Sequence, residues 1–343
     1  MSSVSVAMSG GVDSSVSAFL LKQQGFDVTG VTFKLFESEN SEKSISDARK
    51  VSEFIGINHL VFDLTKEFKN SVINYFIDEY SNGRTPNPCV VCNKTIKFGK
   101  AIEKMESFGF DKIATGHYSL IEKLNGRYAV KKILHKKDQS YCFCMLNQIQ
   151  LSKILTPVSK FSKDEIRNIA KNNGIFVWDK SDSQDICFIK GSYRDFLKEN
   201  GVKNNPGNFV DSSGKILGSH DGIFNYTVGQ RRGLNVSTGE RLYVSSIDVN
   251  SKNIILSKRF GATKIILKNV NFVSFSEENA PKNVQICVRY NSVLIDGILE
   301  TREDKTAILN LSKPAYNVCP GQFSVCYFDN YLVCGGVISK FSL

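Results

Sequence analysis

The chain has 343 residues, more than one hydrophobic core usually organises, so we expect two or three folded domains. Its formal net charge is +10 at pH 7, which would attract a polyanion such as a nucleic acid, although a lysine-rich composition explains this charge equally well. Charged or polar residues interrupt every apolar run, which excludes a membrane-spanning helix. The first eight residues form no basic leader or cleavage site, so we expect a cytoplasmic protein without a membrane partner.

Short apolar strands alternate with helical patterns over the first two hundred residues. This alternation is typical of a parallel sheet with helices on both faces, so we predict a doubly wound α/β domain over residues 1–202. Ser162 and Glu165 have the spacing of a capping box, which predicts another helix that runs to Gly174. The earlier elements are predicted in the order strand 4–8, helix 14–24, strand 26–33, helix 45–55, strand 59–62, helix 66–80, helix 94–105 and strand 112–114.

The pattern changes after about residue 200, where glycines, turn pairs and short β-branched runs replace helical periodicity. We predict a hairpin from Val244 to Ser257 around a turn at 250–253. About six strand-like runs from Lys268 onward have the even spacing of a small barrel. We therefore expect a small β-rich central domain at 203–267 and a C-terminal β-barrel at 268–343.

The segment Ser9-Gly-Gly-Val-Asp-Ser-Ser15 follows a predicted strand and opens a predicted helix. In that position a glycine-rich turn brings backbone N–H groups and the positive end of a helix onto phosphate oxygens. Gly10 and Gly11 permit the close approach, and the hydroxyls of Ser9 and Ser14 can donate further hydrogen bonds. The segment has no lysine after its glycines and does not match G-x-G-x-x-G, which argues against kinase-like chemistry and dinucleotide binding.

This loop resembles the SGGxDS loop (PP-loop) of the ATP pyrophosphatases, which adenylate a substrate oxygen and release pyrophosphate. The resemblance places Phe33 and Gly116 against the nucleotide. It also suggests that Asp13 helps to position Mg²⁺ on the departing pyrophosphate. The implied ATP site consists of Ala7, Met8, Ser9, Gly10, Gly11, Val12, Asp13, Ser14, Phe33 and Gly116.

The nine cysteines are expected to be reduced thiols rather than a disulfide framework. Four of them lie in apolar, strand-like sequence and are interpreted as small buried hydrophobic residues: Cys287, Cys319, Cys326 and Cys334. Cys92 and Cys187 lie instead in polar segments rich in proline or aspartate. A helix is predicted to start near Asn93, so its N-terminus, with Lys94 or Lys97, would favour the thiolate of Cys92.

The segments around these two cysteines, Thr85–Phe98 and Lys180–Ile189, closely resemble the two cysteine motifs of the tRNA-specific 2-thiouridylases. Further matching segments are Gly116–Tyr118, Lys137–Gln139, Asn225–Leu234, Val288–Tyr290 and Pro320–Gln322. The resemblance thus spans essentially the whole chain, which is identified as a member of this family. It implies ATP-dependent 2-thiolation of the wobble uridine (U34) in the tRNAs for Lys, Glu and Gln, with AMP and pyrophosphate as products.

By this resemblance Cys187 would carry a persulfide delivered by a sulfur-relay protein or a cysteine desulfurase, and Cys92 would be the nucleophile. Either the persulfide attacks the adenylated uracil directly or Cys92 first releases hydrosulfide, and both routes end in a transient Cys92–Cys187 disulfide. An alternative remains open because Cys89 and Cys92 form a C-x-x-C pair. With Cys187 they could hold an iron–sulfur cluster, or zinc with Cys142 or Cys144, so no metal ligand is firmly assigned.

The resemblance also places ten residues against the tRNA: Asn87, Pro88, Cys89, His117, Lys137, Asp138, Gln139, Arg289, Tyr290 and Gln322. The first three match a segment that contacts the target base, whereas an arginine can grip phosphate and a tyrosine can stack. A rigid turn at 87–89, a core histidine at 117 and a solvated loop at 131–139 are the alternative readings. Two rival functions are a ligase that acts on a small metabolite and an RNA-binding protein without catalysis.

Overall fold

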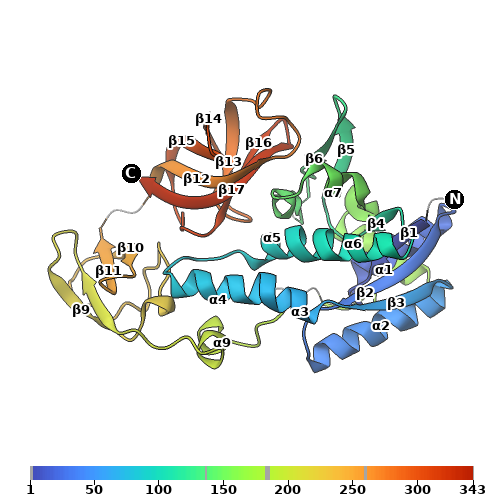
Figure 1. Cartoon of the computed structure of the whole chain (residues 1–343), viewed down its shortest axis with the longest axis horizontal. Helices are drawn as coiled ribbons and strands as arrows, with labels where there is room; N and C mark the ends of the chain where they lie inside the picture. The colour runs from blue at the N-terminus through green and yellow to red at the C-terminus, as the bar shows by residue number, and fades with distance from the viewer. Residues whose placement is uncertain (1–2, 136, 182–185, 259–260, 343) are drawn as a thin grey trace.

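The N-terminal part of the computed structural model is built on a five-stranded parallel sheet (Figure 1). The model describes residues 3–135, 137–181, 186–258 and 261–342. The sheet has the order β3-β2-β1-β4-β7, and all neighbouring strands are parallel. Its strands are β1 (Ser3–Ala7), β2 (Asp27–Lys34), β3 (Asn58–Asp63), β4 (Lys112–Ala114) and β7 (Ile154–Leu155). Because strand order reverses at β1, the carboxyl ends of β1 and β4 form the switch point where such sheets bind ligands.

The predicted helices are present, and the prediction of an α/β domain is confirmed. The two helices predicted at 66–80 and 94–105 are each continuous over several segments that include a π-helical stretch. The helical segments of the domain are α1 (Val12–Gln23), α2 (Glu39–Ile55), α3 (Thr65–Phe68), η1 (Lys69–Ile73), α4 (Asn74–Ser81), α5 (Pro88–Cys92), η2 (Asn93–Lys100), α6 (Ala101–Ser107), η3 (Ser140–Phe143), α7 (Gln148–Lys153), η4 (Pro157–Lys160), α8 (Lys163–Asn172) and α9 (Tyr193–Glu199).

The helix that carries Cys92 begins earlier than expected. Pro88 is its first residue, which suits proline because its φ is already helical and the first turn needs no N–H donor there. The side chain of Asn87 caps the helix and accepts hydrogen bonds from the N–H groups of Cys89 at 3.2 Å and Val90 at 3.4 Å. The predicted start near Asn93 is therefore wrong, and Cys92 lies more than one turn inside the helix.

The capping box at the start of α8 is confirmed. Ser162 Oγ accepts a hydrogen bond from the N–H of Glu165 at 3.3 Å, and the carboxylate of Glu165 accepts one from the N–H of Ser162 at 2.7 Å. These two bonds fix the point at which the chain enters α8. They also fix the position of Lys163, the first residue of that helix.

Two β units follow the α/β domain. The first is a four-stranded sheet of order β10-β11-β8-β9, in which β10 and β11 form the predicted hairpin. The second is a closed antiparallel barrel of order β12-β15-β14-β13-β16-β17, closed by pairing of β12 with β17, as expected for this region. The strands are β8 (Gly207–Val210), β9 (Ile216–His220), β10 (Tyr243–Asp248), β11 (Asn253–Ser257), β12 (Ala262–Phe272), β13 (Asn283–Cys287), β14 (Ile295–Arg302), β15 (Thr306–Ala315), β16 (Phe323–Phe328) and β17 (Tyr331–Ser342), and the short helix η5 (Ile223–Asn225) follows β9. The expected boundary between residues 267 and 268 falls inside β12.

The barrel is joined to the α/β domain by a hairpin and a shared core. The hairpin of β5 (Leu120–Leu124) and β6 (Arg127–Lys131) extends the barrel sheet, where Lys131 pairs with Tyr331 of β17. One hydrophobic cluster contains Val31 and Phe98 of the first domain together with Phe323 of the barrel. In Figure 1 the barrel lies beside α5, the helix that carries Cys92. None of the helices in the described ranges is long and apolar enough to cross a membrane.

Candidate active site

The loop from Ser9 to Ser15 connects β1 to α1 at the switch point of the sheet. Gly10 has φ of +69°, and a Cβ atom there would lie 2.5 Å from the carbonyl oxygen of Ser44 in α2. Gly11 is the N-cap residue of α1 and provides no side-chain cap, and a Cβ atom there would meet Ser9 Oγ at an ordinary 3.5 Å. Gly10 is therefore required by the fold itself. Gly11 leaves the N–H groups of the first helical turn open to an anion.

The hydroxyl groups of the loop hold its shape. Ser14 Oγ accepts a hydrogen bond from the N–H of Ser9 at 3.2 Å and donates one to the carbonyl of Gly11 at 3.2 Å. Ser15 Oγ donates to the same carbonyl at 2.9 Å. Ser14 is buried and Ser9 is exposed, so Ser9 is the better placed of these two predicted donors to reach a ligand.

The other residues predicted to contact the nucleotide differ in how they are packed near the loop. A Cβ atom on Gly116, just after β4, would lie 2.8 Å from Asp13, so only glycine lets this turn pack on the start of α1. Phe33, at the end of β2, is half-buried and stacks on Phe62 with 6.5 Å between ring centroids. The side chains of Met8 and Val12 are buried in the core beside α1, so these two residues face a ligand only through their backbone.

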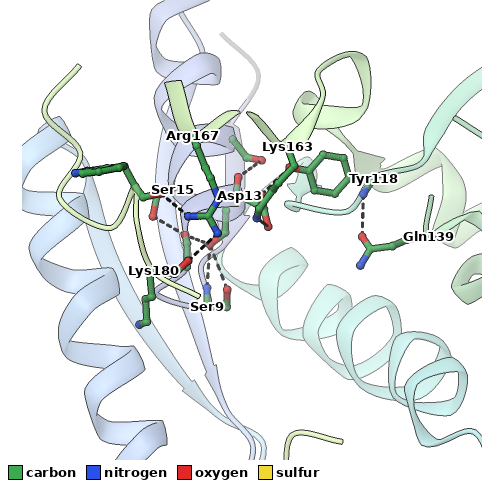
Figure 2. A network of polar contacts seen from close by, with 12 residues as sticks. Ser9, Asp13, Ser15, Tyr118, Gln139, Lys163, Arg167 and Lys180 are labelled. Atoms are coloured by element: carbon green, nitrogen blue, oxygen red, sulfur yellow. Dashed lines mark hydrogen bonds and ion pairs between the residues drawn. The ribbon is translucent and has the colours of Figure 1, made fainter. Parts of the chain in front are cut away.

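Asp13 lies in a network that its sequence position did not reveal (Figure 2). Lys163 Nζ lies 2.7 Å from both carboxylate oxygens of Asp13, and the hydroxyl of Tyr118 donates to Oδ1 at 2.7 Å. Lys163 is largely buried, with its side chain 13% exposed. The carboxylate is therefore already neutralised by a cation. Lys163 would therefore compete with Mg²⁺ for the oxygens of Asp13.

A second lysine reaches the loop from the segment that precedes Cys187. Lys180 Nζ donates to the carbonyl of Gly10 at 2.9 Å and to Asp47 Oδ2 at 2.7 Å. In the sequence Lys180 is the first residue of the second cysteine motif, and no role is predicted for it. The loop, which lacks a lysine of its own, thus receives cations from two distant parts of the chain, Lys163 and Lys180.

Cys92 is a buried thiol, 6% exposed, at the end of α5. The pKa of Cys92 is raised to about 12, with burial as the main cause; Lys97 acts to lower it, and the neighbouring Cys187 and Cys89 act to raise it. The expectation that the start of the helix favours the thiolate is therefore wrong. Cys92 is too far inside the helix to benefit from its N-terminal charge, and removal from water dominates.

Lys97, on the next turn of the same helix, is the cation of this cluster. Burial by itself lowers the pKa of Lys97, but the sulfur atoms of Cys92, Cys89, Cys187 and Cys142 outweigh burial and raise it. The ammonium group thus stabilises negative charge on any of these sulfur atoms. All nine cysteines are free thiols in the structure; Cys89 and Cys187 are exposed, and Cys142 is half-buried.

Cys187 is open to solvent on one side, yet the protein around it raises the pKa of its thiol, with burial as the main cause and Lys97 acting in the opposite direction. This exposure is compatible with the prediction that Cys187 receives sulfur from a donor protein. Electrostatic coupling of Cys187 to both Cys92 and Lys97 places it in the same cluster as the buried thiol.

His117 lies between this cluster and the nucleotide loop. Its Nδ1 is 2.7 Å from Thr115 Oγ1, and its ring packs against Phe98 and Phe143 with centroids 5.8 and 5.3 Å apart. Burial, together with the charge of Lys97, lowers the pKa of His117 to about 3. His117 is therefore a neutral, packed imidazole at physiological pH, and it is unsuited to hold a proton as imidazolium.

The predicted RNA contacts in the 137–139 segment are mostly engaged within the protein. Asp138 accepts hydrogen bonds from the N–H of Ile133 at 3.0 Å and from Ser140 Oγ at 2.7 Å, and burial raises its pKa. Gln139 forms two hydrogen bonds with the backbone of Tyr118, at 2.8 and 2.9 Å. These bonds hold the loop against the turn that contains Gly116. Lys137 is exposed.

The predicted contacts in the barrel come close to the cysteine cluster. Tyr290 donates a hydrogen bond to the carbonyl of Asp138 at 3.2 Å, and Cys142 contributes to the rise of its pKa, in which burial is the largest cause. Arg289 is exposed beside it. Gln322 is only 4% exposed, and its Nε2 donates to the carbonyl of Pro86 at 3.0 Å. The barrel thus holds the turn that leads into the Cys92 helix.

Among the residues that the structure describes, no group of three His, Cys, Asp or Glu side chains is placed to hold a metal ion. Cys89, Cys92 and Cys187 as positioned therefore do not form the ligand set of a cluster.

The fold and the loop define a class: an α/β domain with a PP-loop at its switch point, joined to a small β unit and a β-barrel. Family models match the same three parts. They are described as a tRNA methyl transferase HUP domain over residues 2–191, a tRNA methyl transferase PRC-barrel domain over 194–258 and an aminomethyltransferase beta-barrel domain over 262–338.

Relatives that cover nearly the whole chain carry a common name. A protein from Clostridium acetobutylicum named tRNA-specific 2-thiouridylase MnmA is 43% identical over 98% of this chain and 99% of its own length. A relative of the same name from Thermoanaerobacter pseudethanolicus is 41% identical over 98% of each chain. The chain belongs to the tRNA-specific 2-thiouridylase MnmA family.

A more distant likeness exists among solved structures. The U34-tRNA thiolase NcsA from Methanococcus maripaludis, solved with its 4Fe-4S cluster, matches 58% of this chain and 64% of its own with 20% identity and a TM-score of 0.37. A likeness of this size carries no argument about the chemistry of the present chain.

Proposed function

We propose that the chain is an ATP-dependent tRNA-uridine 2-sulfurtransferase that replaces the 2-oxygen of the wobble uridine with sulfur. The observation that carries the proposal is the presence, in one domain, of a PP-loop and of two electrostatically coupled thiols, Cys92 and Cys187. The full-length relatives named as tRNA-specific 2-thiouridylases support the same reaction and the same kind of substrate.

The first step would be adenylation. The C2 carbonyl oxygen of the uracil attacks the α-phosphorus of ATP, and pyrophosphate leaves with the electron pair of the broken P–O bond. This step is needed because the uracil C2 carbonyl is a poor electrophile, and AMP bound through the former carbonyl oxygen is a good leaving group. The N–H groups at the start of α1 would bind the phosphates, with Mg²⁺ as counterion.

The second step would be sulfur transfer. The terminal sulfur of a Cys187 persulfide attacks C2, and AMP leaves with the original oxygen. The Cys92 thiolate then attacks Sγ of Cys187, which breaks the S–S bond, releases 2-thiouridine and forms a Cys92–Cys187 disulfide. Alternatively, Cys92 attacks first and frees hydrosulfide, which then attacks C2. Both routes end in the same disulfide, and a two-electron thiol reductant resets the enzyme.

The neighbours of Cys92 suit this chemistry. Cys92 must lose a proton before it attacks, and Lys97 is the cation placed to stabilise the resulting thiolate. Asn87, Pro88 and Cys89 lead up to the buried thiol, and of the three Cys89 is exposed, so a base removed from its stack would enter on the side of Cys89. Exposed Arg289 and Tyr290 would contact the RNA from the barrel side, and Lys137 from the loop before η3.

The test is thiolation of an unmodified tRNA with a wobble uridine, in ATP and Mg²⁺ under anaerobic conditions. When a cysteine desulfurase and cysteine supply the persulfide, we expect 2-thiouridine, AMP and pyrophosphate from the wild type and no 2-thiouridine from Cys92→Ser or Cys187→Ser. With hydrosulfide as the donor, both variants should retain activity if the persulfide is bypassed. Cys142→Ser is the matched control, because Cys142 lies in the same cluster but has no assigned role.

Other outcomes would favour other functions. Unchanged adenylation of a small metabolite by both cysteine variants would favour a ligase, and failure to release pyrophosphate with any tRNA would favour an RNA-binding protein without catalysis. Mass spectrometry of the tRNA separates sulfur transfer from the methyl transfer that the family descriptions name. Activity that appears only after iron and sulfide are reconstituted would favour the cluster mechanism.

The physiological partners are part of the proposal. By family resemblance the substrates are the tRNAs for Lys, Glu and Gln in the cytoplasm, and the sulfur donor is a relay protein or a cysteine desulfurase. Each transcribed tRNA is thiolated in turn, with either a desulfurase and cysteine or hydrosulfide as the sulfur source. The yields show which tRNAs are substrates and which sulfur donor the enzyme uses.

A further inference from the structure

The position of Lys180 gives the nucleotide loop a cation that the loop sequence lacks. Its ammonium group donates to the carbonyl of Gly10 at 2.9 Å and to Asp47 Oδ2 at 2.7 Å, so it lies directly against the glycine turn. Its side chain is 33% exposed, whereas that of Asp47 is 15% exposed. The lysine is thus anchored on its inner side and open to solvent on the other.

The backbone at Lys180 is held in place by an arginine of α8. Arg167 of α8 donates to the carbonyls of Trp178 at 2.7 Å and of Lys180 itself at 3.0 Å. Figure 2 shows Arg167 above the loop, with Lys180 and Lys163 on opposite sides of Asp13. These bonds fix the backbone at Lys180, so both the backbone and the ammonium group of this residue are held in place at the loop.

An ammonium group has three N–H donors. Two are used by Gly10 and Asp47, which leaves one for a further acceptor at the loop. A phosphate bound to the N–H groups at the start of α1 would lie within the reach of that donor. During adenylation negative charge grows on the departing pyrophosphate, and a cation at this point would stabilise it.

We propose that Lys180 binds the β- and γ-phosphates of ATP and stabilises the pyrophosphate leaving group. The inference rests on the proposed function, which supplies ATP as the nucleotide and pyrophosphate as the leaving group. Since Lys180 is seven positions before Cys187 in the sequence, the same contact ties an occupied nucleotide site to the beginning of the segment that carries the persulfide.

The test compares two ligands that differ only in these phosphates. Dissociation constants for AMP and for a non-cleavable ATP analogue with Mg²⁺ are measured by calorimetry on the full chain without tRNA. We expect Lys180→Met to weaken binding of the ATP analogue about tenfold to a hundredfold, which is the usual range for loss of a hydrogen bond to a charged group. Binding of AMP should not change. Lys160→Met, at an exposed position on η4, is the matched control and should behave as wild type.

Equal weakening of both ligands would show that Lys180 only maintains the loop, and unchanged binding of both would remove it from the site; either result overturns the proposal. If Lys180→Met does not fold, Asp47→Asn replaces it, because this variant keeps the lysine and removes its competing carboxylate. The ratio of the dissociation constants for AMP and the ATP analogue should then be at least as large in Asp47→Asn as in the wild type. A smaller ratio overturns the proposal. These measurements need no thiolation, so failure of the proposed reaction would be seen separately.

Discussion

The ionisation state of Cys92 can be measured directly through its rate of alkylation. An ordinary cysteine thiol with a pKa of 9.0 is about one-tenth ionised at pH 8, whereas a pKa of about 12 leaves about one molecule in 10,000 as the thiolate. Because only the thiolate reacts, iodoacetamide should label Cys92 in the native protein about a thousandfold more slowly than the same residue in urea.

The pH profile separates ionisation from simple steric protection. In native protein the labelling rate of Cys92 should rise about tenfold per pH unit from pH 7 to 10 without levelling off, whereas the denatured control should level off above pH 9. Peptide mass spectrometry resolves Cys92 from the other thiols, and circular dichroism checks that the protein remains folded. A native profile that levels off below pH 9 would refute the argument that burial outweighs Lys97.

The same shift predicts how stability depends on pH. The folded-state pKa of Cys92 is raised above the unfolded value, so its contribution to stability is complete below pH 9 and is lost as pH rises from 9 to 12. The total is about 4 kcal/mol, of which about 1 kcal/mol is lost by pH 10. The difference in unfolding free energy between wild type and Cys92→Ala should shrink by this amount between pH 8 and 10.

Four further substitutions test the loop, a helix cap and the contact between domains. Gly10→Ala should destabilise the fold by about 2 to 4 kcal/mol, because the new side chain would meet both a positive φ and a backbone clash. Gly11→Ala meets no such clash, so it should unfold in urea like the wild type and lose only affinity for ATP. Ser162→Ala removes the cap of α8 and should cost about 1 kcal/mol in the same urea titration. Gln322→Ala removes the amide N–H that donates to the buried carbonyl of Pro86, so we expect the free energy of unfolding to fall by about 1 to 3 kcal/mol and the KM for tRNA to rise. An unchanged KM and stability would contradict the proposed link between the barrel and the Cys92 helix.

The elements of the α/β domain could be predicted because their signals are local. Apolar periodicity and the glycine-rich loop specify β1 and α1 within a few residues, and the capping box at Ser162 specifies the start of α8. The start of the Cys92 helix differs from the prediction because the segment before Asn93 contains two prolines and shows no helical periodicity. Pro88 preceded by Asn87 is a helix start that could have been recognised from sequence.

The contacts that complete the site could not be predicted from local sequence. Lys163 contacts Asp13 across 150 positions of sequence, and Lys180 contacts Gly10 across 170 positions. In the sequence Lys163 belongs to a helix start and Lys180 to a cysteine motif, so neither suggests a contact with the loop. Gln322 reaches Pro86 across 236 positions. Only the packing of the α/β sheet, α8 and the barrel brings these residues together. The anion site can therefore be predicted from the sequence, but the lysines that reach it cannot.

One helix connects the parts of the site. The continuous helix from Pro88 to Ser107 carries Cys92 and Lys97 on successive turns, and Phe98 on the same helix packs against His117, which follows the nucleotide turn at Gly116. At its beginning, Gln322 of the barrel holds the chain just before the helix. A backbone hydrogen bond from the N–H of Thr85 to the carbonyl of Pro320 at 2.8 Å supports the same turn, so a tRNA that moved the barrel would act on the surroundings of Cys92 through these contacts. A resting thiol that is protonated and buried fits such an arrangement, because it remains unreactive until substrate binding changes the environment of Lys97 and the cysteines.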